Sequence, residues 1–328
     1  MTLLLVLEHD RGKWSDANDE ALTAGRTLAA DMGANLHAVL AGDGALDLAG
    51  QAGAGGAAVV HVISDPMLTD FGPEAVGESV TQLIAATAPA AVMAVGTSRG
   101  NEVMAQVAAR MEQPFVANCV SIDPSGDAWS MTRVQWGGSL LEDATLDSAG
   151  GPKLVSYGHH AVVAEPPAAP GAGDVQEFAP ELDASLARTI VQGRDVQEAG
   201  VTLSTAPVVV SGGRGVGSAE GFAALEELAD VLGGRVGCSR AVTNLGWRNH
   251  TDQVGQTGTR IAPEIYIATG ISGAIQHWVG AMASKRILAI NTDAEANMVT
   301  KADYAVIADL HEVVPAITAE IKRRRGEG

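Results

Sequence analysis

The sequence has few cysteines, and its apolar runs are short. Its 328 residues include two cysteines, Cys119 and Cys238, which lie far apart and fit neither a CxxC motif nor a disulfide framework. The apolar run at 3–7 stops at Glu8 and is too short for a membrane span or a signal peptide. We therefore expect a cytoplasmic bacterial protein, with no direct membrane insertion.

Basic residues are also scarce. Twenty-one Lys and Arg face 39 Asp and Glu, a net charge of −18 that repels nucleic acid and anionic lipid, so we expect no nucleic-acid partner. Aromatic residues make up 4%, whereas 46% of the chain is hydrophobic and 39 residues are glycine. This composition is typical of a globular α/β protein, and the length predicts two domains.

The first half alternates short apolar runs with alanine-rich amphipathic stretches. This βαβ pattern predicts a mainly parallel sheet with flanking helices. From Val116 the pattern becomes shorter and predicts appended antiparallel strands around Gly137-Gly138 and Gly150-Gly151-Pro152, the last of them within 153–163. The Pro-rich stretch 164–173 is expected to be a loop or linker. Strands are predicted at 3–7, 36–40, 59–63 and 91–95, and helices at 18–32 and 73–88.

The second half repeats the parallel α/β pattern, so we predict one domain over 1–195 and another over 196–328. The second is expected to be Rossmann-like and doubly wound. A strand at 206–211 leads into the glycine cluster Gly212–Gly217, then into a helix capped by Ser218 that ends at Leu232. Further strands are predicted at 265–268, 287–290 and 305–308, and helices at 273–282 and 311–325.

The glycine cluster Gly212–Gly217 allows two interpretations. A turn between a strand and a helix can receive a phosphate on its backbone N–H groups, or it can be a tight turn and nothing more. Its spacing is wrong for NAD, because Ser218 replaces the third glycine and no acidic residue ends the next strand. An ordinary nicotinamide-dependent dehydrogenase is therefore disfavoured.

Three other segments are predicted to end near the same edge of the second sheet: Ser239-Arg240, 254–258 and 270–277. Ser272 and Gly273 precede a helix, where exposed amides favour a pyrophosphate. Arg214 and Arg240 add positive charge suited to an anionic dinucleotide, although surface or ion-pair roles are the default for arginine.

These segments resemble the FAD domain of electron transfer flavoprotein alpha subunits. The resemblance covers essentially the whole chain and is strongest from Ala206 onward; it implies FAD in the second domain. It is carried by 210–215, 253–258, 262–268, 270–277, 284–285, 289–291, 302–304, 308–310 and 313–315.

The resemblance also implies which residues hold the cofactor. Arg240, Thr257 and His277 are expected to tune the flavin: Arg240 through its charge, Thr257 through a hydroxyl near N5, and His277 as a donor at the N1 and C2 carbonyl end. Asn291 and Asp309 are expected on the adenosine side. The full expected set is Arg214, Ser239, Arg240, Val254, Gly255, Gln256, Thr257, Ser272, Gly273, Ala274, Ile275, Gln276, His277, Asn291, Asp309 and Leu310.

No cofactor is expected in the first domain. Its Gly96–Gly100 segment resembles a phosphate loop, but we interpret it as a structural turn or a contact for the beta subunit. His159 and His160 match nothing in the family. Neighbouring side chains on a strand point to opposite faces, so no metal site is expected there.

The resemblance implies an electron carrier rather than an enzyme, working as a heterodimer with a beta subunit that holds AMP. Electrons would arrive from a flavoprotein dehydrogenase, for example one that oxidises acyl-CoA or methylamine, and leave to a quinone oxidoreductase. A subunit of an electron-bifurcating complex and, in a different class, a nucleotide-binding sensor or interaction module remain as alternatives.

Overall fold

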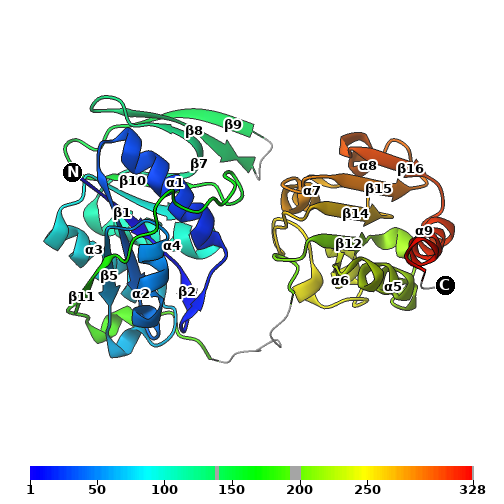
Figure 1. Cartoon of the computed structure of the whole chain (residues 1–328), viewed down its shortest axis with the longest axis horizontal. Coiled ribbons are helices and arrows are strands. Elements are labelled where there is room, and N and C mark those ends of the chain that lie inside the picture. The colour runs from blue at the N-terminus through cyan, green and yellow to red at the C-terminus, as the bar shows by residue number, and fades with distance from the viewer. Residues whose placement is uncertain (137–139, 193–200, 327–328) are drawn as a thin grey trace. The chain divides into compact units, whose positions relative to one another are not determined.

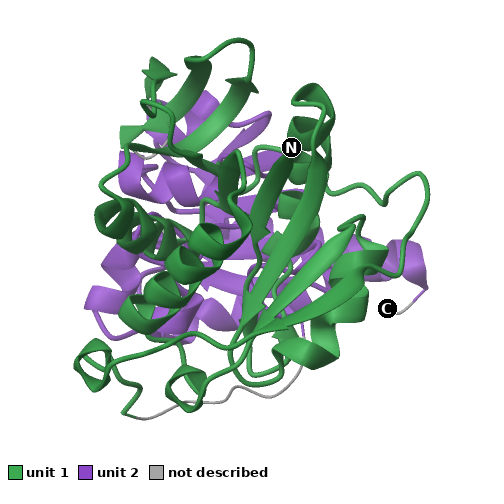
Figure 2. Cartoon of the chain, turned by 90° about the vertical axis from the view of Figure 1, so that its left-hand side faces the viewer, with its two compact units in different colours: residues 1–136, 140–196 green, residues 137–139, 197–328 purple. Residues whose placement is uncertain are grey.

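The computed structural model describes residues 1–136, 140–192 and 201–326. These residues form two compact units (Figure 2): unit 1 comprises 1–136 and 140–192, and unit 2 comprises 201–326. The predicted domain boundary at 195/196 and the Gly137-Gly138 turn lie outside the described residues. Each unit is α/β and is built on a mainly parallel sheet, in agreement with the predicted fold class.

Unit 1 is a sheet in the order β11-β5-β4-β1-β6-β10-β7-β8-β9 (Figure 1). Helices α1 and α2 pack on one face, and α3 and α4 pack on the other. The strands are β1 (Thr2–Val6), β4 (Asn35–Ala41), β5 (Val59–Ile63), β6 (Ala91–Val95), β7 (Phe115–Asp123), β8 (Trp129–Gln135), β9 (Leu140–Leu146), β10 (Lys153–Tyr157) and β11 (Asp174–Phe178), with a hairpin of β2 (His9–Asp10) and β3 (Lys13–Trp14); the helices are α1 (Ala17–Asp31), α2 (Ala45–Ala54), α3 (Pro73–Thr87) and α4 (Ser98–Met111).

Two parts of unit 1 differ from the prediction. Strands β8 and β9 are antiparallel as expected, but β10 pairs parallel with both β6 and β7 inside the sheet. Its Leu154 and Val155 are buried, as central parallel strands require. The chain after the predicted linker also adds β11, parallel to β5 at the sheet edge. Four of the five β11 residues are exposed, so this strand carries little apolar signal.

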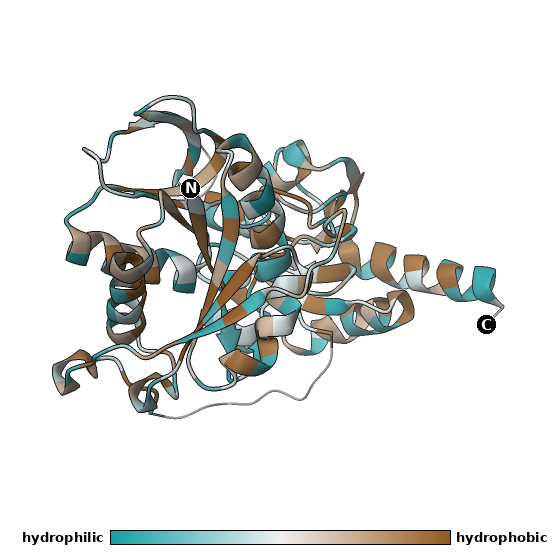
Figure 3. Cartoon of the chain, turned by 60° about the vertical axis from the view of Figure 1, so that its left-hand side comes forward, coloured by the Kyte–Doolittle hydropathy of each residue, from teal (hydrophilic) through white to brown (hydrophobic). Residues whose placement is uncertain are grey.

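Unit 2 is a parallel sheet in the order β13-β12-β14-β15-β16. Helices α5 and α9 pack on one face, and α7 and α8 belong to the core on the other. Figure 3 shows the apolar residues concentrated in the strands and the hydrophilic end of α9. The elements are β12 (Val208–Gly212), α5 (Ala223–Leu232), β13 (Arg235–Cys238), α6 (Arg240–Asn244), β14 (Ile265–Thr269), α7 (Ile275–Ala281), β15 (Ile287–Asn291), α8 (Asn297–Lys301), β16 (Tyr304–Ile307) and α9 (Leu310–Arg325).

The helix predicted from the Ser218 cap starts later than expected. Two 3₁₀ turns, Arg214–Val216 and Glu220–Phe222, precede α5, which begins at Ala223. Ser218 Oγ still accepts a hydrogen bond from the Gly221 N–H at 3.3 Å. The cap therefore closes a short turn, and the glycine cluster does not open directly into an α-helix.

The strand order of unit 2 creates a crevice. The chain runs from β12 to β13 on one side and then returns to β14 on the other side of β12. Loops that follow β12 and β14 therefore leave in opposite directions at the carboxyl edge, which is the usual ligand position in open α/β sheets.

Both cysteines are buried, and neither forms a disulfide. Burial raises the pKa of the Cys119 and Cys238 thiols to about 12, so both are protonated and unreactive near neutral pH. None of the described helices is both long enough and apolar enough to cross a membrane.

The central position of β10 predicts a large effect of truncating Leu154, which is fully buried. Leu154→Ala should lower the free energy of unfolding by about 2–5 kcal/mol, because it removes buried methyl groups and leaves a cavity. Leu46→Ala is the control, since Leu46 is 55% exposed on α2, and it should change stability by less than about 0.5 kcal/mol. Urea unfolding measures both; equal effects would contradict the position assigned to β10.

Candidate functional site

The glycine cluster Gly212–Gly217 lies where the loop after β12 makes a close contact with the loop after β14. The Gly213 N–H donates to Thr269 O at 2.9 Å, and the Gly215 N–H donates to Gly270 O at 3.2 Å. A Cβ on Gly213 would lie 2.1 Å from Gly270 O. Because these two N–H groups already have protein acceptors, the cluster acts as a supporting turn, and its Arg214 is exposed.

The loop 253–258 contains a buried amide that orients Thr257. Gln253 is 1% exposed, and its Oε1 accepts a hydrogen bond from Thr243 Oγ1 at 3.0 Å. Its Nε2 donates to Thr257 Oγ1 at 2.9 Å. The Thr257 oxygen is thus an acceptor toward Gln253, which leaves its proton available to a ligand. Thr257 itself is exposed.

The turn 270–277 packs against this loop. The Gln256 N–H donates to Gln276 O at 2.7 Å, and a Cβ on Gly280 would lie 2.3 Å from the Gly255 nitrogen. Gly273 has a φ of 76° and lies so close to Met298 that a side chain does not fit. In the described part of the chain, the N–H groups of residues 272–274 have no hydrogen-bond acceptor.

His277 on α7 is buried beside Tyr266. The Tyr266 hydroxyl and His277 Nε2 are 2.7 Å apart. Nδ1 is buried and makes no hydrogen bond of good geometry within the described residues, although the Val254 backbone is close enough to act on the ring and raise its pKa. Burial outweighs this and lowers the pKa of His277 to about 4, so the ring is neutral at pH 7. With the phenol as donor, the ring proton lies on Nδ1, which makes no hydrogen bond of good geometry within the described residues.

The remaining predicted residues end strands at the same edge. Ser239 and Arg240 follow β13, and the Ser239 N–H donates to Gly212 O at 3.0 Å. Asn291 Nδ2 donates to Ile271 O at 3.1 Å, and Asp309 Oδ1 accepts from the His311 N–H at 2.9 Å. Their side chains therefore already have structural roles. Leu310 packs on Gly270, where a Cβ would lie 2.8 Å from its Cδ2.

The groups at this edge of the sheet suit a dinucleotide. Unpaired amides at 272–274 and the exposed Arg214 and Arg240 suit a pyrophosphate, and the unsatisfied His277 Nδ1 suits an acceptor on a ring system. Sequence reasoning did not assign roles to Gln253 and Tyr266. Their roles depend on contacts with residues on other segments, which sequence spacing does not show.

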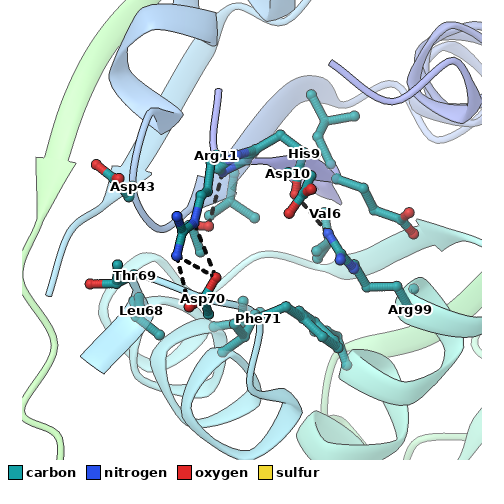
Figure 4. Close-up of a pocket in the computed structure, with 18 residues that line it drawn as sticks. Val6, His9, Asp10, Arg11, Asp43, Leu68, Thr69, Asp70, Phe71 and Arg99 are labelled. Carbon is teal, nitrogen blue, oxygen red and sulfur yellow. Dashed lines mark hydrogen bonds and ion pairs between the residues drawn. The ribbon is translucent and has the colours of Figure 1, made fainter. Parts of the chain in front are cut away.

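The loop Gly96–Gly100 in unit 1 lies beside a different pocket (Figure 4). Thr97 caps α4 by accepting from the Gly100 N–H at 2.9 Å, and its hydroxyl donates to the Glu8 carboxylate. Burial raises the pKa of Glu8, despite the hydrogen bond from Thr97 and the charge of Arg99. A carboxylate thus occupies the start of the helix, where a phosphate would otherwise bind.

The two arginines of this pocket also have internal partners. Arg11 pairs with Asp70 at 2.8 Å. Arg99 donates to His9 O at 2.7 Å and lies over the Phe71 ring, 4.4 Å from its centre. These contacts favour the interpretation of the loop as a structural turn.

Unit 2 is thus a dinucleotide-binding α/β unit, and comparison with known proteins identifies its family. The family models "Electron transfer flavoprotein domain" and "Electron transfer flavoprotein FAD-binding domain" match residues 3–183 and 202–282. The electron transfer flavoprotein subunit alpha of Thermoanaerobacterium thermosaccharolyticum is 34% identical, over 97% of both chains. That of Mycobacterium tuberculosis is 36% identical over 99% of both. Protein FixB of Bradyrhizobium diazoefficiens is 32% identical, over 98% of this chain and 88% of that protein.

The chain belongs to the electron transfer flavoprotein alpha subunit family, and its cofactor is FAD.

The glycine contact predicts a site-specific loss of FAD. Gly213→Ala places a Cβ against Gly270 O and forces the two loops apart, so the Kd for FAD should rise at least about tenfold, or about 1.4 kcal/mol. Gly50→Ala is the control, because a Cβ at Gly50 on α2 meets nothing within 4 Å. Titration of the apoprotein followed by flavin fluorescence measures both; an unchanged Kd in Gly213→Ala would contradict the contact.

The burial of His277 predicts acid sensitivity of the chain without FAD. In the unfolded chain the pKa of His277 is near its ordinary value of 6.5, whereas in the folded chain it is about 4. Stability present above pH 6.5 is therefore lost as the pH falls toward 4, by roughly 3 kcal/mol in total.

Urea unfolding at several pH values measures this loss, which His277→Gln should reduce. His250→Gln, at an exposed position, is the control and should leave the pH dependence as it is. An identical pH dependence in the parent chain and His277→Gln would show that His277 is not buried in its neutral form.

Proposed function

We propose that this chain is the FAD-holding subunit of a heterodimeric electron carrier. It takes electrons from a flavoprotein dehydrogenase and delivers them to a quinone oxidoreductase. A smaller beta subunit that holds AMP is its partner, and unit 1 contributes to that contact. The two unbonded, buried cysteines are consistent with a cytoplasmic location.

The feature that supports this function best is the convergence of 254–258 and 272–277 at the carboxyl edge of unit 2. FAD supplies the redox chemistry when it is bound. The residues of the chain bind and orient it: the amides of 272–274 face the pyrophosphate, and Arg214 and Arg240 balance its charge.

Two side chains are proposed to face the flavin ring. Gln253 orients the Thr257 hydroxyl as a donor, at 2.9 Å. The Tyr266 hydroxyl lies 2.7 Å from Nε2 of His277 and fixes the ring, so that Nδ1 remains available to the cofactor. A neutral donor at this position stabilises negative charge as it develops, without adding a fixed charge.

We infer that the chain acts as a carrier rather than as an enzyme. The proposed groups bind the cofactor and adjust its charge, and none is assigned to a substrate of its own.

Substitution of Arg240 tests how much its positive charge contributes to the midpoint potential of the flavin. Arg240→Gln should lower the midpoint potential of the bound flavin by roughly 30 mV, about 1.4 kcal/mol for a two-electron couple, because a positive charge near the ring favours anionic reduced states. Arg240→Lys keeps the charge and should retain most of the potential. Spectroelectrochemistry measures both variants; a potential unchanged in Arg240→Gln would remove Arg240 from this role.

The carrier function itself is tested by reconstitution. The chain, co-expressed with its beta subunit, should show flavin absorbance that bleaches when a flavoprotein dehydrogenase and its substrate are added. The colour should return on addition of a quinone oxidoreductase and quinone. A complex that stays colourless after incubation with FAD would falsify the proposal, and so would a coloured complex that no flavoprotein dehydrogenase reduces.

A further inference from the structure

Three side chains with metal-ligating atoms meet beside α1 in unit 1, outside the FAD site. Glu20 lies in the first turns of α1, and His159 and His160 follow β10. One ligand atom from each of the three lies within 4.8 Å of the others. The three residues are partly buried, and the His160 and Glu20 side chains are 15% and 16% exposed. Such a cluster of two imidazoles and a carboxylate matches a known class of metal-binding set.

The expectation that the two histidines point to opposite faces was wrong, because they are not on a strand. Strand β10 ends at Tyr157, and His160 adopts a left-handed φ of 62°. Their rings stack, with centroids 3.7 Å apart and planes 26° from parallel. The turn thus brings both imidazoles to the same place.

His160 is held to Glu20 by two contacts and has one free nitrogen. Its backbone N–H donates to Glu20 Oε2 at 2.7 Å, and its Nδ1 lies 2.8 Å from Glu20 Oε1. Its Nε2 is buried and has no hydrogen-bond partner within the described residues. A buried polar atom without a partner is costly. A metal ion uses the lone pair of an imidazole nitrogen, and an ion that binds both residues replaces the contact between His160 Nδ1 and Glu20.

The segment after β10 is already fixed to α1 one turn further along. The Glu165 N–H donates to Thr23 Oγ1 at 3.0 Å, and Thr23 Oγ1 donates to Glu165 O at 3.1 Å. Arg26 donates to the same carbonyl. Glu20, Thr23 and Arg26 are spaced three residues apart, so they share a face of the helix. The segment that follows the two histidines is therefore anchored to α1 before any ion binds, which lowers the entropic cost of binding.

We propose that Glu20, His159 and His160 form a binding site for a divalent transition metal ion, with water as a further ligand. Zn²⁺ is the expected occupant, because it accepts imidazole nitrogen and carboxylate oxygen together. Mg²⁺ and Ca²⁺ prefer oxygen ligands and are excluded by the two imidazoles. The bound ion joins the segment after β10 to α1, and the site is independent of FAD.

Calorimetric titration of the full-length chain with Zn²⁺, after treatment with a chelator and dialysis, tests the site. One Zn²⁺ should bind per chain, and Glu20→Gln, His159→Ala and His160→Ala should each raise its Kd at least about tenfold. His250→Ala is the control for adventitious binding at an exposed imidazole, and it should leave the Kd unchanged.

A purely structural role for the Glu20–His160 contact gives a different result. In that case the three variants would melt at lower temperature but bind Zn²⁺ as the parent chain does, which would overturn the proposal. Failure of the parent chain to bind Zn²⁺ would overturn it as well. Glu20→Gln keeps an oxygen acceptor for His160, so it remains informative if His160→Ala does not fold.

Discussion

The site in unit 2 depends on the close approach of the loops that follow β12 and β14. Gly213 and Gly215 donate their N–H groups to Thr269 and Gly270, and a side chain on Gly213 would collide with the Gly270 carbonyl. This contact uses the N–H groups of Gly213 and Gly215, so these two amides are not available to a phosphate. It also fixes the start of the following turn, where the N–H groups of residues 272–274 have no acceptor within the described residues. The glycines therefore shape the FAD site indirectly.

A second set of contacts orients two polar side chains of the proposed FAD site. Gln253 is buried and connects Thr243 to Thr257, while Tyr266 is buried against His277. In each case a buried residue fixes the hydrogen-bonding direction of the residue proposed to face the flavin. Burial also keeps His277 neutral, since it lowers the pKa of the ring to about 4. Thr257 and His277 are thus neutral groups whose orientation is set by buried partners.

Apolar patterning predicted most of the fold, because the central parallel strands of both units are buried on two faces. It misassigned β10, whose neighbours in the sheet are distant in sequence, and it missed β11, which is exposed at an edge. Within the site, spacing and family resemblance led to residues 254–258 and 272–277. The contacts of Gln253 and Tyr266 depend on tertiary structure, so neither residue spacing nor the family resemblance predicted them. The same is true of the His159 and His160 pair, whose stacking requires the left-handed turn at His160.

The central claim is that FAD occupies the carboxyl edge of unit 2 and contacts two segments of the chain. Hydrogen exchange of the full-length chain, with and without FAD, tests this most directly. FAD should slow amide exchange at 254–258 and 272–277 and leave 96–100 in unit 1 unchanged. Protection confined to unit 1, or no protection at 272–277 in FAD-saturated protein, would contradict the account.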